Sequence, residues 1–257
     1  MAEPDEKAVK PFLDHLEDLR ATIIRCAIAL GLGMAVSFPF VPRIMALLQA
    51  PLTKVLGDSA PSLQSLEVTG AFSVAVRCSM WSGILLAAPF IFFFIGRFVF
   101  PGLTKVEKNV VLKSSGFAVG LFFLGVYLGY TVVLHTALRL MEGMHRWLNI
   151  EAQWRVNDYV AFVVHLLLAF GLAFELPVVL LILGRLGIVN ARQLRERRPY
   201  VIVILLVVAM VLTPPDIVTQ LTMAIPLYGL YEISLWIVWV WEKRKAASER
   251  DADLWKR

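Results

Sequence analysis

Cysteine and charged residues are scarce in this 257-residue sequence, which has two cysteines and 18% charged residues. Cys26 and Cys78 form no CxxC motif and no metal-ligand spacing, so we expect both to be small packing residues. A soluble domain is usually about half apolar and a quarter charged, whereas this chain is 58% hydrophobic with a mean hydropathy of +0.71. The composition therefore disfavours a soluble enzyme, a disulfide-stapled secreted domain and a disordered chain.

Catalytic and targeting motifs are also missing. The sequence contains no nucleotide-binding loop, metalloprotease motif, nucleophile elbow or haem-attachment signature, so we expect no enzyme activity, cofactor or metal. Residues 1–22 carry six acidic and three basic residues, which is unlike a secretory signal or an organelle transit peptide. This pattern predicts a mature, cytoplasmic N-terminus.

Long apolar blocks are what the sequence has in abundance, and a spanning helix needs about 20 mostly apolar residues. The fifth block is short, because the 14 residues from Pro199 to Leu212 extend only about 21 Å as a helix. Pro214, Pro215 and Asp216 then form a turn that leads into the sixth block. We predict an all-α integral membrane protein with one domain over 1–240, short last two helices and a loose charged tail over 241–257. The six predicted spans are 23–41, 72–96, 113–135, 158–184, 199–213 and 217–240.

The lysines and arginines between these blocks predict the orientation. With the N-terminus inside, 18 of them fall on the cytoplasmic side and five on the outer side, while Arg25 and Arg77 lie within spans. Both termini are therefore predicted to be cytoplasmic. The positive charge is then a topology signal with anionic lipid as its neighbour, which argues against nucleic-acid binding. The outer connections 42–71 and 136–157 carry apolar residues at helical spacing and predict short interfacial helices.

Two clusters of acidic residues lie on the predicted cytoplasmic side. Asp14 and Asp18 stack at i, i+4 on a helix whose apolar stripe includes Leu16, so a cationic partner would relieve their repulsion. The alternative is a solvated helix start with acids favoured by the helix dipole. Glu107 lies between Lys105 and Lys108 in the first inner loop, where the alternative is a surface ion pair.

Two further features lie in or beside the predicted spans. Glu175 is the only acid in the fourth block and should face a wet cavity, find a partner or bind a proton, while Pro177 should kink the helix beside it. Asp216 can cap the sixth helix, with Gln220 one turn further on. Arg77 could pair with a carboxylate or snorkel to the outer surface.

The segments that carry these features resemble the TatC family, the multispanning receptor of twin-arginine protein translocation. The resemblance implies a six-helix, glove-shaped bundle in the bacterial cytoplasmic membrane that binds twin-arginine signal peptides of folded precursors. It also implies assembly with TatB-type and TatA-type single-span partners, homo-oligomers within a larger complex, and transport driven by the proton-motive force. The matching stretches are Phe12 to Arg20, Pro101 to Lys108, Phe170 to Pro177, Arg197 to Tyr200, Leu212 to Gln220, Ala224 to Pro226 and Tyr231 to Ile233.

The resemblance also implies roles for individual residues. Glu107 and Asp18 would bind the two arginines, although the family more often has Glu at the position of Asp18, whose side chain is one methylene shorter. Arg20, Leu16 and Phe98 complete the implied peptide site. The intramembrane and concave-face residues would be Glu175, Gln220 and Arg77, and the structural turn would be Pro214, Pro215 and Asp216.

Two other functions fit the same sequence features. A secondary transporter could use Glu175 as a proton or cation site, with His165 and Gln220 as the modest polar groups near it. A passive membrane scaffold would show no selectivity between Arg-Arg and Lys-Lys peptides.

Overall fold

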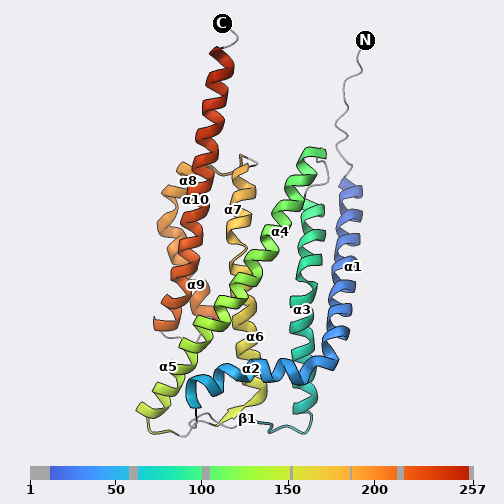
Figure 1. Ribbon diagram of the computed structural model, residues 1–257, viewed down its shortest axis with the longest axis vertical. Helices are drawn as coiled ribbons and strands as arrows, with labels where there is room; N and C mark the ends of the chain where they lie inside the picture. The colour runs from blue at the N-terminus through green and yellow to red at the C-terminus, as the bar shows by residue number, and fades with distance from the viewer. Residues whose placement is uncertain are drawn as a thin grey trace. The chain divides into compact units, whose positions relative to one another are not determined.

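The computed structural model describes residues 12–57, 63–99, 105–150, 153–185, 187–212 and 217–254. These residues are almost entirely helical, which confirms the predicted all-α class (Figure 1). The sequence did not predict one minor feature, a parallel pair of two-residue strands that joins Leu63 to Trp154 and Gln64 to Arg155. In chain order the elements are α1 (Phe12–Ser37), η1 (Phe38–Phe40), α2 (Val41–Leu56), β1 (Leu63–Gln64), α3 (Gly70–Val99), α4 (Lys105–Leu128), the π-helical segment η3 (Gly129–Val133), α5 (Leu134–Trp147), β2 (Trp154–Arg155), α6 (Val156–Ala173), α7 (Leu176–Arg185), α8 (Ala191–Glu196), α9 (Arg198–Leu212) and α10 (Ile217–Leu254).

Five stretches of helix are long and apolar enough to cross a bilayer, and they cover five of the six predicted blocks. The fifth block forms α9, which has only 15 residues and so confirms the short helix expected there. The number of crossings and the side on which each terminus lies stay predictions. The five stretches are Leu16–Leu56, Gly70–Phe98, Ser115–Trp147, Val156–Arg185 and Ile217–Arg244.

The C-terminal part differs from the sequence-based expectation in two respects. Helix α10 has 38 residues and is not short, and it continues without a break to Leu254 where a loose tail was expected. The physical reason lies in the composition of this segment, since Ala, Glu, Lys and Arg are strong helix formers that extend a helix already started by the apolar block. The predicted turn at Pro214, Pro215 and Asp216 lies outside the described residues.

The fourth block is interrupted as predicted. Helix α6 ends at Ala173 and α7 begins at Leu176, with Phe174 and Glu175 in a turn between them. Pro177 has no N–H group to offer the carbonyl of Ala173, so a regular helix cannot continue through this point. The amide of Glu175 donates instead to the Leu172 carbonyl oxygen, at 3.0 Å.

The connections predicted as interfacial helices are helical, with one difference. Helix α2 buries Leu48, Leu52 and Leu56, one turn apart, as an amphipathic helix should. Helix α5 is not a separate short helix, because α4 passes through η3 directly into it. The third span and the second outer connection are therefore joined by a π-helical segment, of the kind found within otherwise continuous helices.

The chain forms two compact units where the sequence predicted a single domain over 1–240. Unit 1 comprises Met1–Pro42 and Ala75–Val119, and unit 2 comprises Arg43–Val74 and Gly120–Arg257. Apolar blocks do not predict such a division, because lipid is as apolar as the helices and gives them no hydrophobic reason to pack together.

Unit 1 contains the antiparallel pair of α1 and the main part of α3. The two helices approach most closely at Gly33 and Gly83, where a Cβ on Gly33 would lie 2.6 Å from the Gly83 carbonyl oxygen. Only glycine allows backbones to come this close. Away from this contact α1 keeps a large apolar surface exposed, including Ile28 and Leu32, as expected of a helix solvated by lipid.

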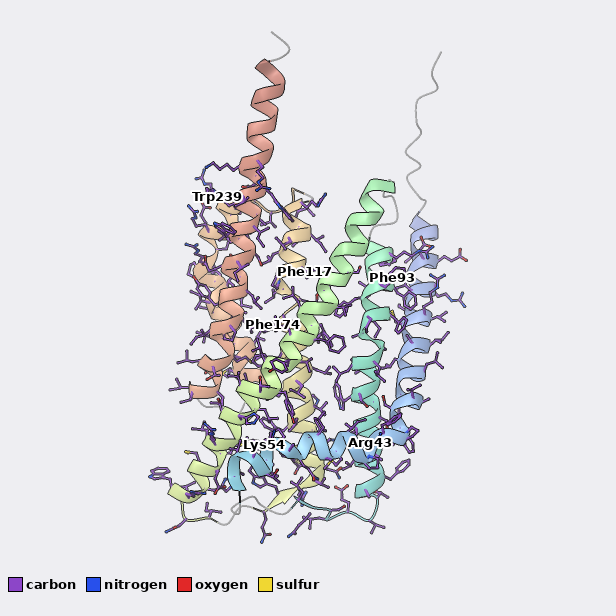
Figure 2. The ribbon with its side chains drawn as sticks, viewed as in Figure 1. Arg43, Lys54, Phe93, Phe117, Phe174 and Trp239 are labelled. Carbon is purple, nitrogen blue, oxygen red and sulfur yellow. The ribbon has the colours of Figure 1, made fainter. Side chains whose placement is uncertain are left out.

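Unit 2 has a close-packed centre. Phe174, in the turn after α6 (labelled in Figure 2), and Phe170 of α6 are buried. Both pack against Gly125 of α4, where an added Cβ would lie 2.6 Å from the Phe170 carbonyl oxygen. Two tyrosine hydroxyl groups fasten α2 to this unit: Tyr130 donates to the Leu47 carbonyl oxygen at 2.7 Å and Tyr159 donates to that of Leu48 at 2.6 Å.

Candidate functional site

The residues predicted to bind a peptide all belong to unit 1, at the end where α1 begins, α3 ends and α4 begins (Figure 1). The Gly33–Gly83 contact shows which residues of the two antiparallel helices lie opposite each other. Both rise about 1.5 Å per residue, so 15 residues back along α1 and 15 forward along α3 lead to Asp18 and Phe98 at the same level, about 22 Å from the glycines.

Helix α4 brings Glu107 to the same end of unit 1. Glu107 lies in the first turn of α4, and only residues 100–104 separate Val99 at the end of α3 from Lys105 at the beginning of α4. A chain of this length spans at most about 20 Å, so the first turn of α4 stays close to the end of α3. The side chain of Glu107 lies outside the described residues.

The side chains of α1 that are predicted to bind the peptide can be reached from outside the helix pair. Asp18 is half-buried, while Leu16 and Arg20 are exposed. The backbone carbonyl oxygen of Asp18 accepts a hydrogen bond from the Thr22 hydroxyl group at 2.8 Å, which is an ordinary contact within a helix. Phe98 is half-buried in the last turn of α3. The structure thus brings four of the five predicted peptide-site residues to one end of α1 and α3, and places the backbone of the fifth, Glu107, nearby.

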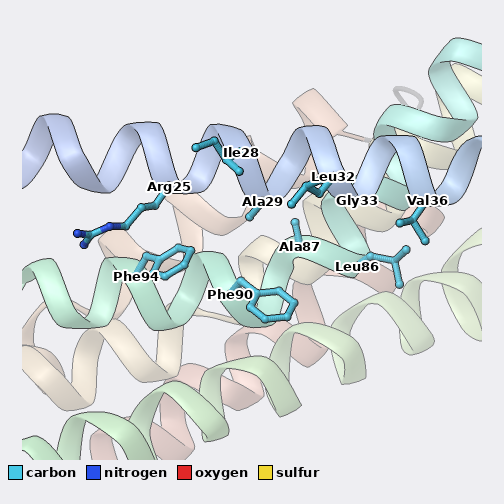
Figure 3. Close-up of a pocket in the computed structure, with 10 residues that line it drawn as sticks. All are labelled: Arg25, Ile28, Ala29, Leu32, Gly33, Val36, Leu86, Ala87, Phe90 and Phe94. Atoms are coloured by element: carbon cyan, nitrogen blue, oxygen red, sulfur yellow. The ribbon is translucent and has the colours of Figure 1, made fainter.

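An apolar groove of about 480 Å³ runs between α1 and α3 below this end (Figure 3). Each of its two walls is a row of apolar side chains that recur one helical turn apart, and small residues form its floor. Arg25 lies at one end of the groove, beside Phe94 (Figure 3). The wall residues are Ile28, Leu32 and Val36 of α1 and Leu86, Phe90 and Phe94 of α3, and the floor residues include Ala29, Gly33 and Ala87.

Helical periodicity puts Asp18 on the groove side of α1. Asp18 and Val36 are 18 residues apart, which is about five full turns at 3.6 residues per turn, so both project from the same face. Arg25 and Ala29 lie seven and 11 residues after Asp18, within about 20° of that face. On α3, Phe98 follows Phe94 by one turn. Asp18 and Phe98 therefore extend the two walls of the groove toward the helix ends.

This arrangement can do two things chemically. A carboxylate at the end of the helix pair can accept charge-assisted hydrogen bonds from a cationic group, most strongly from the planar fork of a guanidinium. The groove that continues from it offers exposed apolar side chains to an apolar segment. The combination suits an extended ligand with positive charge at one end and an apolar stretch after it.

Glu175 forms a separate feature in unit 2. Its side chain is half-buried in the turn between α6 and α7, and its Oε1 atom is buried with no hydrogen-bond partner among the described residues. Phe174, which is 2% exposed, and Gly125 hold this turn in place. The sequence-based expectation that Glu175 lies beside a helix break is confirmed.

The other predicted polar residues have different surroundings. The side-chain Nε2 of Gln220 on α10 donates to the Leu206 carbonyl oxygen of α9 at 2.9 Å, so this side chain joins the last two helices. Arg77 is exposed on α3. The predicted turn residues from Pro214 to Asp216 belong to the stretch that is not described.

A polar cluster that the sequence reasoning missed lies in unit 2, between α9 and α10. Arg198 Nη2 lies 2.6 Å from Glu232 Oε2, and the hydroxyl group of Tyr228 donates to Glu232 Oε1 at 2.7 Å. Tyr231 stacks near Tyr228 and donates to the Leu194 carbonyl oxygen of α8 at 2.6 Å. A signal was present in the sequence, because Glu232 is an acid inside the sixth apolar block. Among the described residues, no group of three or more His, Cys, Asp or Glu side chains could hold a metal ion.

Comparison with known families supports the resemblance seen in the sequence. The family model described as Sec-independent protein translocase protein (TatC) matches residues 14–226. The chain is 36% identical over 255 residues to the Sec-independent protein translocase protein TatC of Desulforapulum autotrophicum, covering 98% of this chain and 92% of that protein. It is 32% identical over 226 residues to the protein of the same name from Escherichia coli K12, covering 88% and 87%.

Two solved structures are similar to this one. A crystal structure of the twin-arginine translocase receptor TatC superimposes with a TM-score of 0.76 at 34% identity, covering 87% of this chain and 97% of that one. A second crystal structure of a TatC receptor, in DDM, gives a TM-score of 0.78 at 34% identity and covers 87% and 98%.

Proposed function

The chain belongs to the TatC family of Sec-independent protein translocase proteins, and on this premise we propose that unit 1 carries its binding site for twin-arginine signal peptides. The protein is a multi-pass membrane component of the twin-arginine translocation system, and its role is transport. The observation that carries the proposal is that Asp18 lies on the same face of α1 as the apolar groove.

The two arginines of the peptide bind to Glu107 and Asp18. Each guanidinium presents two parallel N–H donors to a carboxylate, and a charge-assisted hydrogen bond of this kind contributes about 1.5–3 kcal/mol. Lysine carries the same charge on a compact ammonium group and lacks this fork, so it binds less tightly. Phe98 of α3 lies at the level of Asp18 and limits the access of water to the pair. Leu16 and Arg20, two residues before and after Asp18, project from the other side of α1 and flank the site there.

The apolar stretch that follows the arginines lies in the groove between α1 and α3. The groove begins about seven residues after Asp18 on the same helix face, which corresponds to about 10 Å. An extended chain covers this distance in about three residues. Burial of apolar side chains against Leu32 and Phe90 then adds affinity that does not depend on the arginine pair.

Glu175 acts after binding, in the transport step. A carboxylate in a membrane span is costly when it is ionised, and residues of this kind usually face water, a partner or a proton. The Oε1 atom of Glu175, which is buried and has no hydrogen-bond partner in the described part of the chain, supports such a role. Proton-motive force drives transport, and we assign Glu175 as the group of this chain that responds to it.

The chain assembles with TatB-type and TatA-type single-span proteins and with further copies of itself, with both termini in the cytoplasm. The wide apolar surfaces that α1 and α10 leave exposed, for example at Leu32 and Trp236, support contact with other helices and with lipid. Membership of a translocase family argues against the alternative of a secondary transporter that uses Glu175.

Peptide binding to groove variants tests this function. Leu32→Trp fills the groove, and we expect it to weaken binding of a fluorescent twin-arginine signal peptide to the full chain in lipid nanodiscs. Ile24→Trp is the matched control, because Ile24 is exposed on α1 and does not line the groove. Equal affinity of the two variants would remove the groove from the binding site.

A further inference from the structure

A second hollow lies in unit 2, where the turn between α7 and α8 meets α10. It has a volume of about 420 Å³ and is lined by both polar and apolar side chains, including those of Arg185, Asn190, Trp241, Glu242 and Arg244. Small-molecule ligands are usually bound in pockets of about 300–1,000 Å³. We propose that this hollow binds the phosphodiester headgroup of an anionic phospholipid with one negative charge, such as phosphatidylglycerol.

The hollow lies at the depth of lipid phosphates. The apolar stretch Val156–Arg185 ends at Arg185, and the apolar stretch Ile217–Arg244 ends at Arg244, so both guanidinium groups stand where the hydrocarbon gives way to headgroups. Trp239 and Trp241 are exposed at the same level, as in the aromatic belts of membrane proteins. Basic pockets between spans at this depth are typical sites for anionic lipid headgroups.

The backbone gives the hollow its form. Gly184 packs so closely on α10 that an added Cβ would lie 2.8 Å from Val238 Cγ2. The chain then turns through Gly187, whose φ of 72° suits glycine. Asn190 caps the start of α8 with a capping box in which the backbone N–H of Gln193 donates to Asn190 Oδ1 at 2.8 Å. These contacts fix the wall that faces the arginines.

The two arginines are available to an anion. The guanidinium of Arg185 lies over the Trp241 ring at 6.0 Å, and among the described residues neither Arg185 nor Arg244 forms an ion pair. Arginine binds phosphate oxygens through two parallel N–H groups, so a phosphate between these side chains would receive charge-assisted hydrogen bonds.

Glu242 determines which headgroup fits. Its Oε1 atom already accepts a hydrogen bond from the Ala191 amide at 3.0 Å, which keeps the carboxylate in the wall of the hollow. Two guanidinium groups and one carboxylate leave a net charge of about +1, which matches a single phosphodiester. The carboxylate also disfavours a doubly charged phosphate and can accept a hydrogen bond from a headgroup hydroxyl group, as glycerol provides.

Native mass spectrometry of the full chain in detergent tests the site. We expect phosphatidylglycerol to bind more tightly than phosphatidylcholine with the same acyl chains. The double variant Arg185→Gln/Arg244→Gln should lose about tenfold or more of the phosphatidylglycerol affinity. The matched control is Arg192→Gln/Arg195→Gln, which removes two exposed arginines of α8 that do not line the hollow and should leave the affinity unchanged.

Three results would overturn the proposal: equal binding of the two lipids by the unaltered chain, equal affinity of the two double variants, or displacement of the lipid by glycerol phosphate at equal concentration. The last result would mean that the hollow takes a free phosphate and not a lipid. If the glutamine variant fails to fold, the double variant Arg185→Lys/Arg244→Lys tests the site instead, because it keeps the positive charge and removes the planar guanidinium group. It should bind phosphatidylglycerol more weakly than the unaltered chain, and unchanged affinity would overturn the assignment.

Discussion

Gly33 and Gly83 bring α1 and α3 so close together that a Cβ on Gly33 would lie 2.6 Å from the carbonyl oxygen of Gly83. This contact sets how far the two helices are shifted along each other, and so brings Asp18 and Phe98 to the same end of unit 1.

The first prediction concerns this helix contact. Gly33→Ala forces α1 and α3 apart, and overpacking of this kind costs about 1–3 kcal/mol of the free energy of unfolding. We expect a lower thermal midpoint in detergent and weaker binding of a twin-arginine peptide. Gly31→Ala is the control, since a Cβ there meets nothing within 4 Å. If both variants had the same midpoint and the same peptide affinity, the contact would not set the helix pair.

The second prediction concerns Glu107. Glu107→Gln removes the charge and keeps the shape, so the chain should still insert into the membrane while twin-arginine peptide affinity falls about tenfold or more. Glu196→Gln is the control, because Glu196 is an exposed acid that pairs with Arg192 on α8. Peptide crosslinking at the level of the unaltered chain in Glu107→Gln would exclude this residue from the site.

The third prediction concerns the length of the acidic side chain on α1. Asp18→Asn should weaken peptide binding, whereas Asp18→Glu should preserve it, because Glu keeps the charge and reaches one methylene further. Glu17→Gln serves as the control, since Glu17 is the exposed neighbour of Asp18 on the adjacent face of the helix. Loss of binding in Asp18→Glu would mean that the site requires the shorter side chain.

The fourth prediction compares two ion pairs of unit 2. Arg198 and Glu232 lie 2.6 Å apart with their side chains about one-third exposed, while Arg192 and Glu196 lie 2.9 Å apart and are mostly exposed. A double-mutant cycle should give a coupling free energy of about 1–2 kcal/mol for the first pair and under about 0.5 kcal/mol for the second. Equal coupling energies would show that the bond between α9 and α10 contributes no more to stability than a surface pair.

The fifth prediction separates binding from transport. Glu175→Gln keeps the size of the side chain and removes its ability to lose a proton, so we expect normal peptide binding with impaired export of a folded precursor. Leu172→Gln is the control, because Leu172 is exposed in the last turn of α6, three residues before Glu175, and carries no charge. Export at the rate of the unaltered chain in Glu175→Gln would leave the residue with a structural role only.

The sequence predicted those features that depend on local physical chemistry. Apolar length predicted the membrane helices, and Pro177 predicted the break beside Glu175. The i, i+4 pair of Asp14 and Asp18 left a cationic partner and a solvated helix start both open, and the resemblance to the TatC family implied the binding role of Asp18. The alignment of Asp18 with a groove became visible only once the Gly33–Gly83 contact gave the helix register. A contact between two helices distant in the sequence has no local signature.

Two other features were beyond the sequence reasoning for different reasons. The cluster of Arg198, Glu232 and Tyr228 needs α9 and α10 to be side by side, although the acid in an apolar block was a clue. The helical continuation of α10 to Leu254 was missed because charged residues were taken to indicate a loose tail, whereas their helix propensity was the stronger effect.

The most direct test of the peptide site is the affinity of the purified full chain, in lipid nanodiscs, for two signal peptides that differ only in an Arg-Arg or a Lys-Lys pair. If carboxylates bind the guanidinium forks, the Arg-Arg peptide should bind about tenfold or more tighter than the Lys-Lys peptide. Glu107→Gln and Asp18→Asn should each reduce this preference. Equal affinity for the two peptides, unchanged by either substitution, would contradict the proposed recognition of the twin arginines.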